Sequence, residues 1–461
     1  MAKSSIIRRI ATAAGCLAAL AGALTSCSPD QVNLLSTVPD SAPAVMTFDA
    51  GRFFPLAGLT ADGATLTAEK SIAGSPFDLS PLGTEGYNAL MHSIDGSHLV
   101  FFVDARRTPF LTFEITDLKA FEKFAGEYGE PESSQGFKTW TAPDGLKITM
   151  RGAQGWISRD PQPGASLKAV LDAAAQQSVM QSIGVANALQ DNSQLFNFEL
   201  NTGGEYRIMA QGMEDSERLG IDFRAMKPDG ELMELTQTQT VAEDFLRYTG
   251  PEMTIVAAAG LRPEFTSSVD WNTVATAVEN MTGLGASPLT MLAPLMADVD
   301  GTVALAMGPV SEEAWEEPSL ATWHIMLMAH MPMEKIRSAL DTFSGYFALG
   351  GLKPTTDART GMMTVPFYGS TLRLGPVDGY LAISNTPLQP VEQNSLTPVF
   401  NGKQGALSAK LPALDFVPGM QKGMNIEMQL ETQRLYVRLM PVDKTSPALG
   451  SVLGLLVTLA L

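Results

Sequence analysis

The reactive side chains of this sequence are few, and one of them occupies a distinctive place. The chain holds only two cysteines, Cys16 and Cys27, and four histidines. Cys27 follows a basic stretch and then Ile10–Leu24, an uncharged run rich in Ala and Leu. That run has the length of a signal-peptide core and falls short of the ~20 residues that a membrane-spanning helix needs. We therefore expect residues 1–26 to be a removable signal peptide that leaves Cys27 at the start of the mature chain.

The four residues that end at this cysteine, Leu24-Thr25-Ser26-Cys27, resemble a lipobox, the signal for bacterial lipoprotein maturation. In such signals a small residue precedes the cysteine, which carries acyl chains on its thiol and amine after cleavage. The resemblance implies that Cys27 is lipidated. Several acyl chains anchor a protein stably, whereas one alone binds a membrane only marginally. The alternative is an ordinary secretory signal with a coincidental cysteine.

Cysteine and charge content limit the partners of the mature chain. After cleavage no pair of thiols remains, so no intramolecular disulfide can stabilise the fold. The whole chain has a formal net charge of −18, and removal of the basic signal makes the mature protein more acidic still. This charge excludes nucleic acid as a plausible partner.

A second apolar run, Pro447–Leu461, closes the sequence. It has no charged side chain but is too short to cross a bilayer, and it contains Gly450 and Gly454. We expect it to be a buried terminal helix or strand, with a membrane-surface segment as the alternative.

The sequence contains no recognisable catalytic, metal or cofactor motif, and we expect no catalytic residue, no metal ligand and no cofactor. The segment Asp298–Gly301 has two carboxylates before a turn glycine but lacks the further ligands of a calcium-binding loop, so we interpret it as a structural turn. The histidines do not have the i, i+4 spacing of a zinc-binding helix. They are His92, His98, His324 and His330.

One loop, Gly308–Leu320, has the composition of an interaction surface. Trp315 stands among four glutamates, and an exposed Trp is a favoured interface anchor. The hypothesis is a partner-contact loop formed by Glu313, Trp315 and Glu316. The alternative is a solvated insertion whose Trp folds back on its own domain.

Similar stretches recur in the same order along the chain. Arg218–Phe223 resembles Arg434–Leu439 at an offset of 216 residues, and both alternate like half-buried strands. Leu90–Ser97 resembles Leu295–Thr302 at an offset of 205, and each turns through Asp-Gly into an apolar strand. Two stripes of amphipathic helices also share one spacing. They are Leu118, Phe121, Ala125 and Tyr128 in one stretch and Met333, Ile336, Leu340 and Phe343 in the other.

These matches predict a tandem duplication, with chance similarity between two generic stretches as the alternative. Hairpin-linked strands with interspersed helices and no regular βαβ alternation are typical of the α+β class. We therefore expect two homologous α+β copies, each a largely antiparallel sheet with packed amphipathic helices. The copies span residues 38–245 and 250–461, and residues 27–37 form a lipidated tether after the signal peptide.

The lipobox, the strand-start pattern VPDSAPAV at Val38–Val45 and the duplicated layout together resemble a family of uncharacterised Bacteroidota lipoproteins that share a domain of unknown function. The resemblance covers nearly the whole mature chain and implies no catalytic residue. Surface-exported lipoproteins of that phylum carry an acidic cluster after the cysteine, whereas Ser28–Val32 has only Asp30. This departure favours a position that faces the periplasm, and Ser28, in place of the Asp that marks inner-membrane retention, favours the outer membrane.

We expect from these features a membrane-anchored, non-catalytic envelope protein that binds or scaffolds a protein or glycan partner, with any ligand in a groove between the copies. The alternative is a hydrolase of envelope or dietary glycans or peptides, with residues assembled from distant positions. A cleft with two carboxylates ~5 to 10 Å apart would favour a glycosidase.

Overall fold

A computed structural model describes residues 33–68, 77–215, 218–273, 276, 293–315, 319–391, 394–413 and 423–442. The signal peptide, the lipobox with Cys27, Glu316 and the run Pro447–Leu461 lie outside the described residues. No helix within the described ranges is long and apolar enough to cross a membrane.

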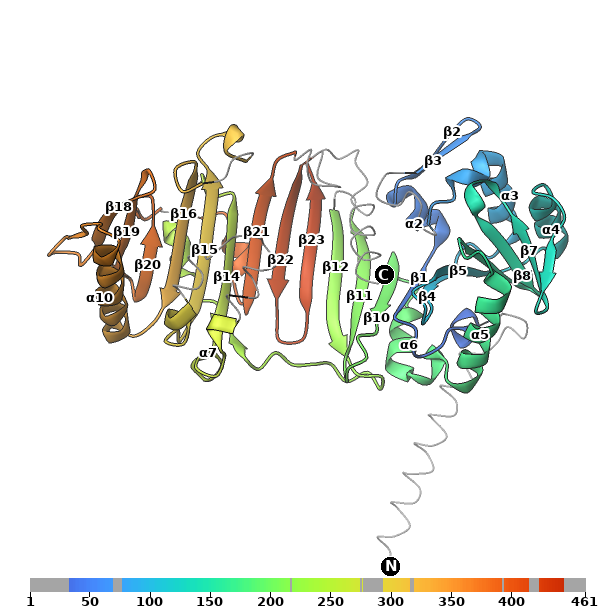
Figure 1. The fold of residues 1–461 in the computed structure, drawn as a ribbon, viewed down its shortest axis with the longest axis horizontal. Helices are drawn as coiled ribbons and strands as arrows, with labels where there is room; N and C mark the ends of the chain where they lie inside the picture. Colours follow the sequence, from blue (N-terminus) through green and yellow to red (C-terminus); the bar gives the residue numbers. More distant parts are fainter. Residues whose placement is uncertain are drawn as a thin grey trace, which may run out of the picture.

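The architecture is a mixture of helices and one very large antiparallel sheet, which confirms the expected combination of antiparallel strands and packed helices. Twenty-one strands form this sheet, and β2 and β3 pair as a separate hairpin. Figure 1 shows the sheet running along the longest axis of the molecule, with most helices at its two ends.

The first half of the sheet contains the strands up to residue 226 except the separate β2–β3 hairpin. Read from its outer edge, the order is β6-β7-β8-β9-β5-β4-β1-β10-β11-β12. The strands are β1 (Ala44–Phe48), β2 (Leu59–Asp62), β3 (Thr65–Ala68), β4 (Leu99–Val103), β5 (Pro109–Glu114), β6 (Glu132–Ser134), β7 (Phe137–Thr141), β8 (Lys147–Arg151), β9 (Gln154–Ser158), β10 (Phe196–Leu200), β11 (Arg207–Asp215) and β12 (Arg218–Met226). The helices are η1 (Leu34–Thr37), α2 (Ala50–Leu56), η2 (Ser80–Leu82), α3 (Gly83–Ser93), α4 (Leu118–Gly126), η3 (Pro143–Gly145), α5 (Pro163–Gln176), η4 (Val179–Gln181) and α6 (Ile183–Leu189).

The second half continues the sheet from β12 in the order β23-β22-β21-β14-β15-β16-β20-β19-β18-β17, and the short β13 pairs with the end of β14. The strands are β13 (Thr238–Gln239), β14 (Ile255–Leu261), β15 (Thr302–Pro309), β16 (Trp323–His330), β17 (Thr355–Thr356), β18 (Met363–Phe367), β19 (Ser370–Val377), β20 (Tyr380–Ser384), β21 (Gly405–Leu411), β22 (Met424–Leu430) and β23 (Leu435–Pro441). The helices are η5 (Glu243–Tyr248), α7 (Pro263–Thr266), η6 (Glu312–Trp315), α10 (Met333–Leu349) and α11 (Thr397–Phe400).

The two halves meet edge to edge through β12 and β23. Residues 219–223 of β12 pair antiparallel with residues 435–439 of β23, so backbone hydrogen bonds run without a break from one half into the other. These described strands therefore form one surface at the junction, and the groove expected between two copies does not form between them.

Each face of the sheet carries its own core. On the face that we call the α10 face, α4 packs in the first half and α10 in the second, around Phe121 and Ile336. On the opposite α11 face, α5 and α6 cover the first half and η5 and α11 cover the second, around Leu167 and Phe400. Alternate residues of each strand contribute to the two faces because successive side chains of a strand point to opposite sides.

The predicted helix stripes are correct in their centres and wrong at their starts. Phe121 and Ile336 are fully buried, but Leu118 and Met333 are each 45% exposed because they lie in the first turn, at the rim of the contact. Asp117 caps α4 as its residue type suggests, accepting hydrogen bonds from the backbone N–H groups of two residues in the first turn.

A tight turn joins the outer strands β19 and β20. Asp378 and Gly379 both have positive φ, 47° and 85°, between β19 and β20. Two successive positive φ angles are the mark of a type I′ hairpin turn, which Asp-Gly adopts readily.

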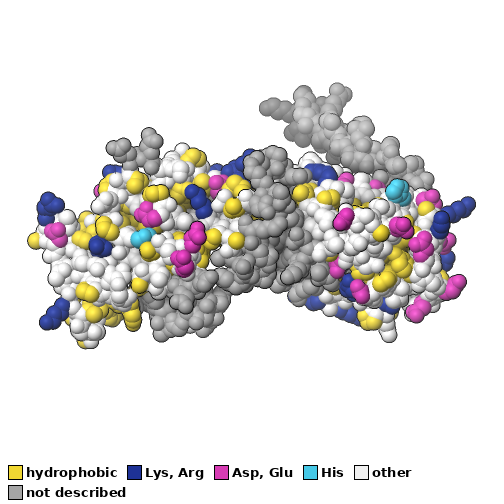
Figure 2. Space-filling view, turned by 90° about the horizontal axis from the view of Figure 1, so that it is seen from above, with side chains coloured by type: hydrophobic (Ala, Val, Ile, Leu, Met, Phe, Trp, Pro, Cys, Tyr) yellow, Lys and Arg dark blue, Asp and Glu magenta, His cyan; other side chains and the backbone are white. Residues whose placement is uncertain are grey.

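Charged side chains are mixed over the surface. In the view from above, acidic and basic groups are interspersed at both ends of the molecule (Figure 2). The net negative charge is thus spread out on this face and does not form a single acidic patch.

Candidate binding site

The turn Asp298–Gly301 acts as a structural element. Asp300 Oδ1 lies 2.7 Å from His330 Nδ1, and Asp298 pairs with Lys335 at 2.8 Å. The backbone carbonyl of Gly301 accepts a hydrogen bond from Leu261. Both carboxylates therefore have protein partners, and among the described residues no group of three His, Cys, Asp or Glu side chains is placed to hold a metal ion.

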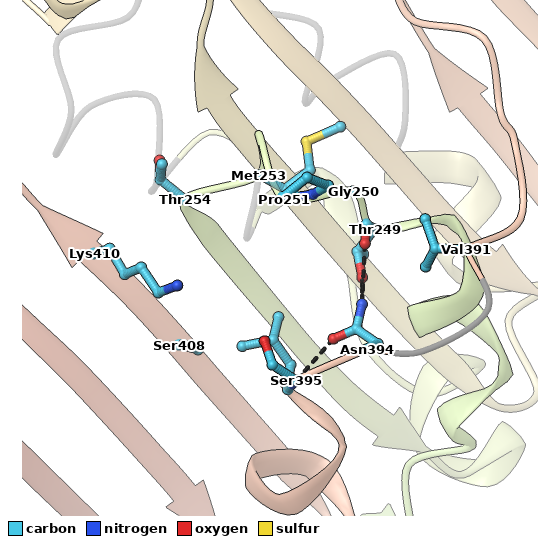
Figure 3. Close-up of a pocket in the computed structure, with 11 residues that line it drawn as sticks. Thr249, Gly250, Pro251, Met253, Thr254, Val391, Asn394, Ser395, Ser408 and Lys410 are labelled. Carbon is cyan, nitrogen blue, oxygen red and sulfur yellow. Dashed lines mark hydrogen bonds between the residues drawn. The ribbon is translucent and has the colours of Figure 1, made fainter.

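A pocket of about 240 Å³ lies on the α11 face of the second half. Three segments build it: the link from η5 to β14, the segment that leads to α11, and the end of β21 (Figure 3). Its lining combines polar side chains with apolar ones in similar measure, and the polar groups could orient a small ligand. The lining residues are Thr249, Gly250, Pro251, Met253, Thr254, Val391, Asn394, Ser395, Leu396, Ser408 and Lys410.

Asn394 holds the two loops of this pocket together. Its side-chain amide donates to the backbone carbonyls of Leu246 and Thr249 at 2.9 and 3.0 Å and to the Thr249 hydroxyl at 2.5 Å. Its carbonyl oxygen accepts from the backbone N–H of Leu396 at 2.8 Å. One side chain thus fixes the segment before α11 to the end of η5, which keeps the pocket walls in place.

The floor of the pocket comes from β21. Ser408 and Lys410 alternate with apolar residues, so both side chains lie on the α11 face. The backbone N–H of Lys410 donates to the carbonyl of Thr254 at 2.8 Å, which brings β14 and β21 side by side at the pocket. Figure 3 shows the Lys410 side chain extending from β21 toward the pocket.

One charged group of the pocket is open to a ligand. The Lys410 side chain is exposed and forms no ion pair with the residues that the structure describes. The Thr254 hydroxyl oxygen is buried without a hydrogen-bond partner in the same described set, so a ligand in the pocket reaches it only if the wall moves. The Lys410 ammonium suits an anionic oxygen such as a carboxylate.

A buried ion group occupies a comparable place in the first half. Arg207 donates to Asp40 Oδ2 and to Glu199 Oε1, both at 2.7 Å, and the side chains of Glu199 and Arg207 are 0% and 7% exposed. Asp40 also accepts hydrogen bonds from Ser182 at 2.6 Å and Gln177 at 3.1 Å. Burial raises the pKa of Glu199 to about 7, although the nearby Arg207 opposes the shift.

This ion group is closed to substrate. Its two carboxylates share one guanidinium and lie beneath α5, η4 and α6, so they lack the solvent-open cleft of a carboxylate pair that hydrolyses glycans. No local sequence pattern brings Asp40, Glu199 and Arg207 together, because these residues are far apart in the chain.

The predicted contact loop is partly described. Trp315 ends η6, and its half-buried ring packs edge-on against Trp323 with the ring centroids 4.8 Å apart. The Trp323 indole N–H donates to the carbonyl of Ala314 at 2.8 Å, which ties the loop to β16. Glu313 is exposed beside it. The ring therefore has a partner within its own half, and the contact-loop hypothesis stays a prediction.

Comparison of the chain with protein-family models found no match, and comparison with curated proteins found none either.

The sequence patterns did not indicate the pocket at Lys410. The one local signal that could have indicated it is the alternation of Ser408 and Lys410 with apolar residues on a strand. That pattern is shared by most half-exposed strands, so it does not distinguish a site.

Proposed function

We propose that this chain is a lipid-anchored envelope protein that binds a small anionic ligand without catalysing a reaction. The anchor is Cys27 within a lipobox-like sequence, and the position is the outer membrane facing the periplasm, as in the Bacteroidota lipoproteins that the sequence resembles. The pocket at Lys410 is the site of the small ligand. A protein or glycan is the second type of partner that this chain would bind.

The observation that carries the proposal is an exposed lysine, without an ion-pair partner among the described residues, at a walled pocket. A ligand carboxylate would accept hydrogen bonds from the Lys410 ammonium. The volume of about 240 Å³ restricts the ligand to a small molecule or to one end of a larger one.

The test is the thermal stability of the full chain in the presence of acetate, succinate, glutamate or galacturonate. Binding to the folded state raises the unfolding temperature as ligand concentration rises. We expect at least one carboxylate to stabilise the wild type, Lys410→Met to weaken that effect about tenfold, and Lys353→Met, an exposed lysine outside the pocket, to leave it unchanged. Equal responses from wild type and Lys410→Met would show that the pocket is not the ligand site.

A duplicated origin of the two halves belongs to the same proposal. Each half has the same strand order on either side of the β12–β23 pair, and the helix before the outer meander is α4 in one and α10 in the other. In that pair Ile221 lies opposite Val437, its counterpart at the offset of 216 residues. A twofold axis through this point would exchange the halves. An experimental structure in which β1–β12 fail to superimpose on β14–β23 would contradict the duplication.

The contact loop supplies a second binding candidate with a simple test. Capture of partners from envelope extracts by wild type and by Trp315→Ala should differ if the loop anchors a partner. Unchanged capture would leave Trp315 with its packing role against Trp323.

A further inference from the structure

The α10 face of the central strands has no polar side chain among the strand residues that the structure describes. Strand register places every second residue of β23, β22, β21, β14, β15 and β16 on this face. They are Leu435, Val437 and Leu439; Met424, Ile426, Met428 and Leu430; Leu407, Ala409 and Leu411; Ile255, Ala257, Ala259 and Leu261; Val303, Leu305 and Met307; and Trp323, Ile325, Leu327 and Ala329.

This apolar face is broad and only partly covered. In Figure 1, α10 lies in front of β18 to β20, and no described helix crosses in front of the middle of β14, β15 or β21 to β23. Leu305 is 37% exposed, and Ile255, Leu407 and Met428 are half-buried, whereas Trp323, Met424 and Leu439 are buried. The six strands at ~4.8 Å spacing span about 29 Å, and the part in contact with water is their middle. Apolar patches of more than a few hundred Å² are uncommon on soluble monomers and mark a docking surface.

The opposite face differs on the two strands next to the junction. On β22 and β23 the α11 face carries Glu427 and Arg438, whose side chains form an ion pair at 3.1 Å. On β14, β15 and β16 the α11 face is also largely apolar, but η5 and α11 cover it.

The chain itself contains a segment of matching character and reach. β23 belongs to the apolar face and ends at Pro441, only a few residues before Pro447–Leu461. That run has no charged side chain, and as a helix its fifteen residues would be about 22 Å long, within the dimensions of the face. A tethered segment also binds at a high effective concentration, whereas a second copy must lose its freedom of translation and rotation.

We propose that Pro447–Leu461 docks on the apolar α10 face of β14, β15, β16, β21, β22 and β23 and completes the core of the second half. The docked segment would remove Leu305, Leu407 and Met428 from water. It would also keep the largest apolar surface of the protein from associating with lipid or with another copy of the chain.

The experiment is intramolecular cross-linking in the full-length protein. Leu305→Cys is combined in turn with Leu449→Cys, Leu453→Cys and Leu456→Cys, and each pair is treated with a short bismaleimide and mapped by mass spectrometry. The matched control replaces Leu305→Cys with Lys410→Cys, an exposed residue on the opposite face. We expect links within one chain from position 305 to at least one partner position and none from position 410.

The other outcomes overturn the proposal. Links between chains would show that a second copy covers the α10 face. Equal linking from both faces, or no link from position 305, would show that Pro447–Leu461 does not dock on the α10 face. Deletion after Ser446 gives a second measurement: binding of a hydrophobic dye should rise several-fold in the truncated protein. Unchanged dye binding by a truncated protein that unfolds cooperatively would also contradict the docking.

Discussion

The buried ion group of the first half and the pocket of the second half differ in whether their polar groups have partners within the protein. In the first half, Asp40 precedes Val45 by five residues, and Val45 lies opposite Glu199 on β10. In the second half, Thr249 precedes Thr254 by five residues, and Thr254 lies opposite Lys410 on β21. Both places lie where a strand pairs with the neighbour that follows it in the sheet order, but one holds a buried ion group and the other an open pocket.

The covering segments account for much of the difference. In the first half, the chain before β10 forms α5, η4 and α6. From this segment, Ser182 and Gln177 donate hydrogen bonds to the Asp40 carboxylate. In the second half, the chain before β21 is a short segment with α11, and Asn394 reaches Thr249 instead. A longer covering segment excludes water, and a buried charge without water is stable only if it is paired. A short covering segment leaves a cation in contact with solvent. The first-half group is therefore buried and fully paired around Arg207, whereas the second-half pocket leaves Lys410 exposed.

The largest effect should come from Arg207→Met. The substitution leaves the carboxylates of Asp40 and Glu199 buried without their cation, and such a loss costs about 3 to 5 kcal/mol. Urea unfolding should show this decrease in the free energy of unfolding. Arg106→Met, at an exposed arginine in the turn after β4, is the control and should change it by less than about 0.5 kcal/mol. A small effect at Arg207 would mean that the ion group is not a stabilising element.

Glu199 should make stability depend on pH. Its folded-state pKa of about 7 lies above the ordinary value of 4.5, so between these pH values the folded chain binds more protons than the unfolded chain. The free energy of unfolding should therefore fall as pH rises from 4.5 to 7, by at most about 3 kcal/mol from this group.

Glu199→Gln isolates this contribution, because glutamine does not titrate while it keeps the shape of the side chain. The difference in unfolding free energy between wild type and Glu199→Gln should decrease steadily over this pH window. A difference that stays constant, or that rises with pH, would contradict the raised pKa.

A smaller loss of stability should follow from Asn394→Ala. The substitution leaves the carbonyls of Leu246 and Thr249 without the amide that bonds them, which costs about 2 kcal/mol. It should also loosen the pocket walls and weaken any carboxylate stabilisation. Asn272→Ala, at an exposed asparagine elsewhere in the second half, should do neither. Normal ligand response in Asn394→Ala would show that the walls do not depend on this residue.

The smallest change in stability should come from Lys410→Met. Because this lysine is exposed and unpaired with described residues, its removal should shift the free energy of unfolding by less than about 0.5 kcal/mol. The contrast with Arg207→Met, measured by the same urea titration, tests the comparison directly. A loss above about 2 kcal/mol would place Lys410 in a stabilising role like that of the first-half ion group.

Local patterns allowed several elements to be predicted before the fold was known. The alternation of Arg218–Phe223 and Arg434–Leu439 predicted two strands, which are β12 and β23, and the helix stripes predicted the buried centres of α4 and α10, since these patterns involve only near neighbours. The exposure of Leu118 and Met333 was not predictable in this way, because a helix stripe does not reveal how far the helix extends past its sheet. The pocket and the Arg207 ion group also escaped prediction.

The sequence by itself determined which residues alternate on strands, where helices start and where hairpins turn, since short-range sterics and hydrogen bonding control these features. Tertiary structure alone decided that β12 pairs with β23 and that Arg207 meets Asp40 at a separation of 167 residues. It also decided that Lys410 stands at the edge of a pocket while Glu199 is buried. The physical reason is that edge pairing, burial and the local dielectric depend on what distant segments cover, and that information is not contained in any local stretch of the chain.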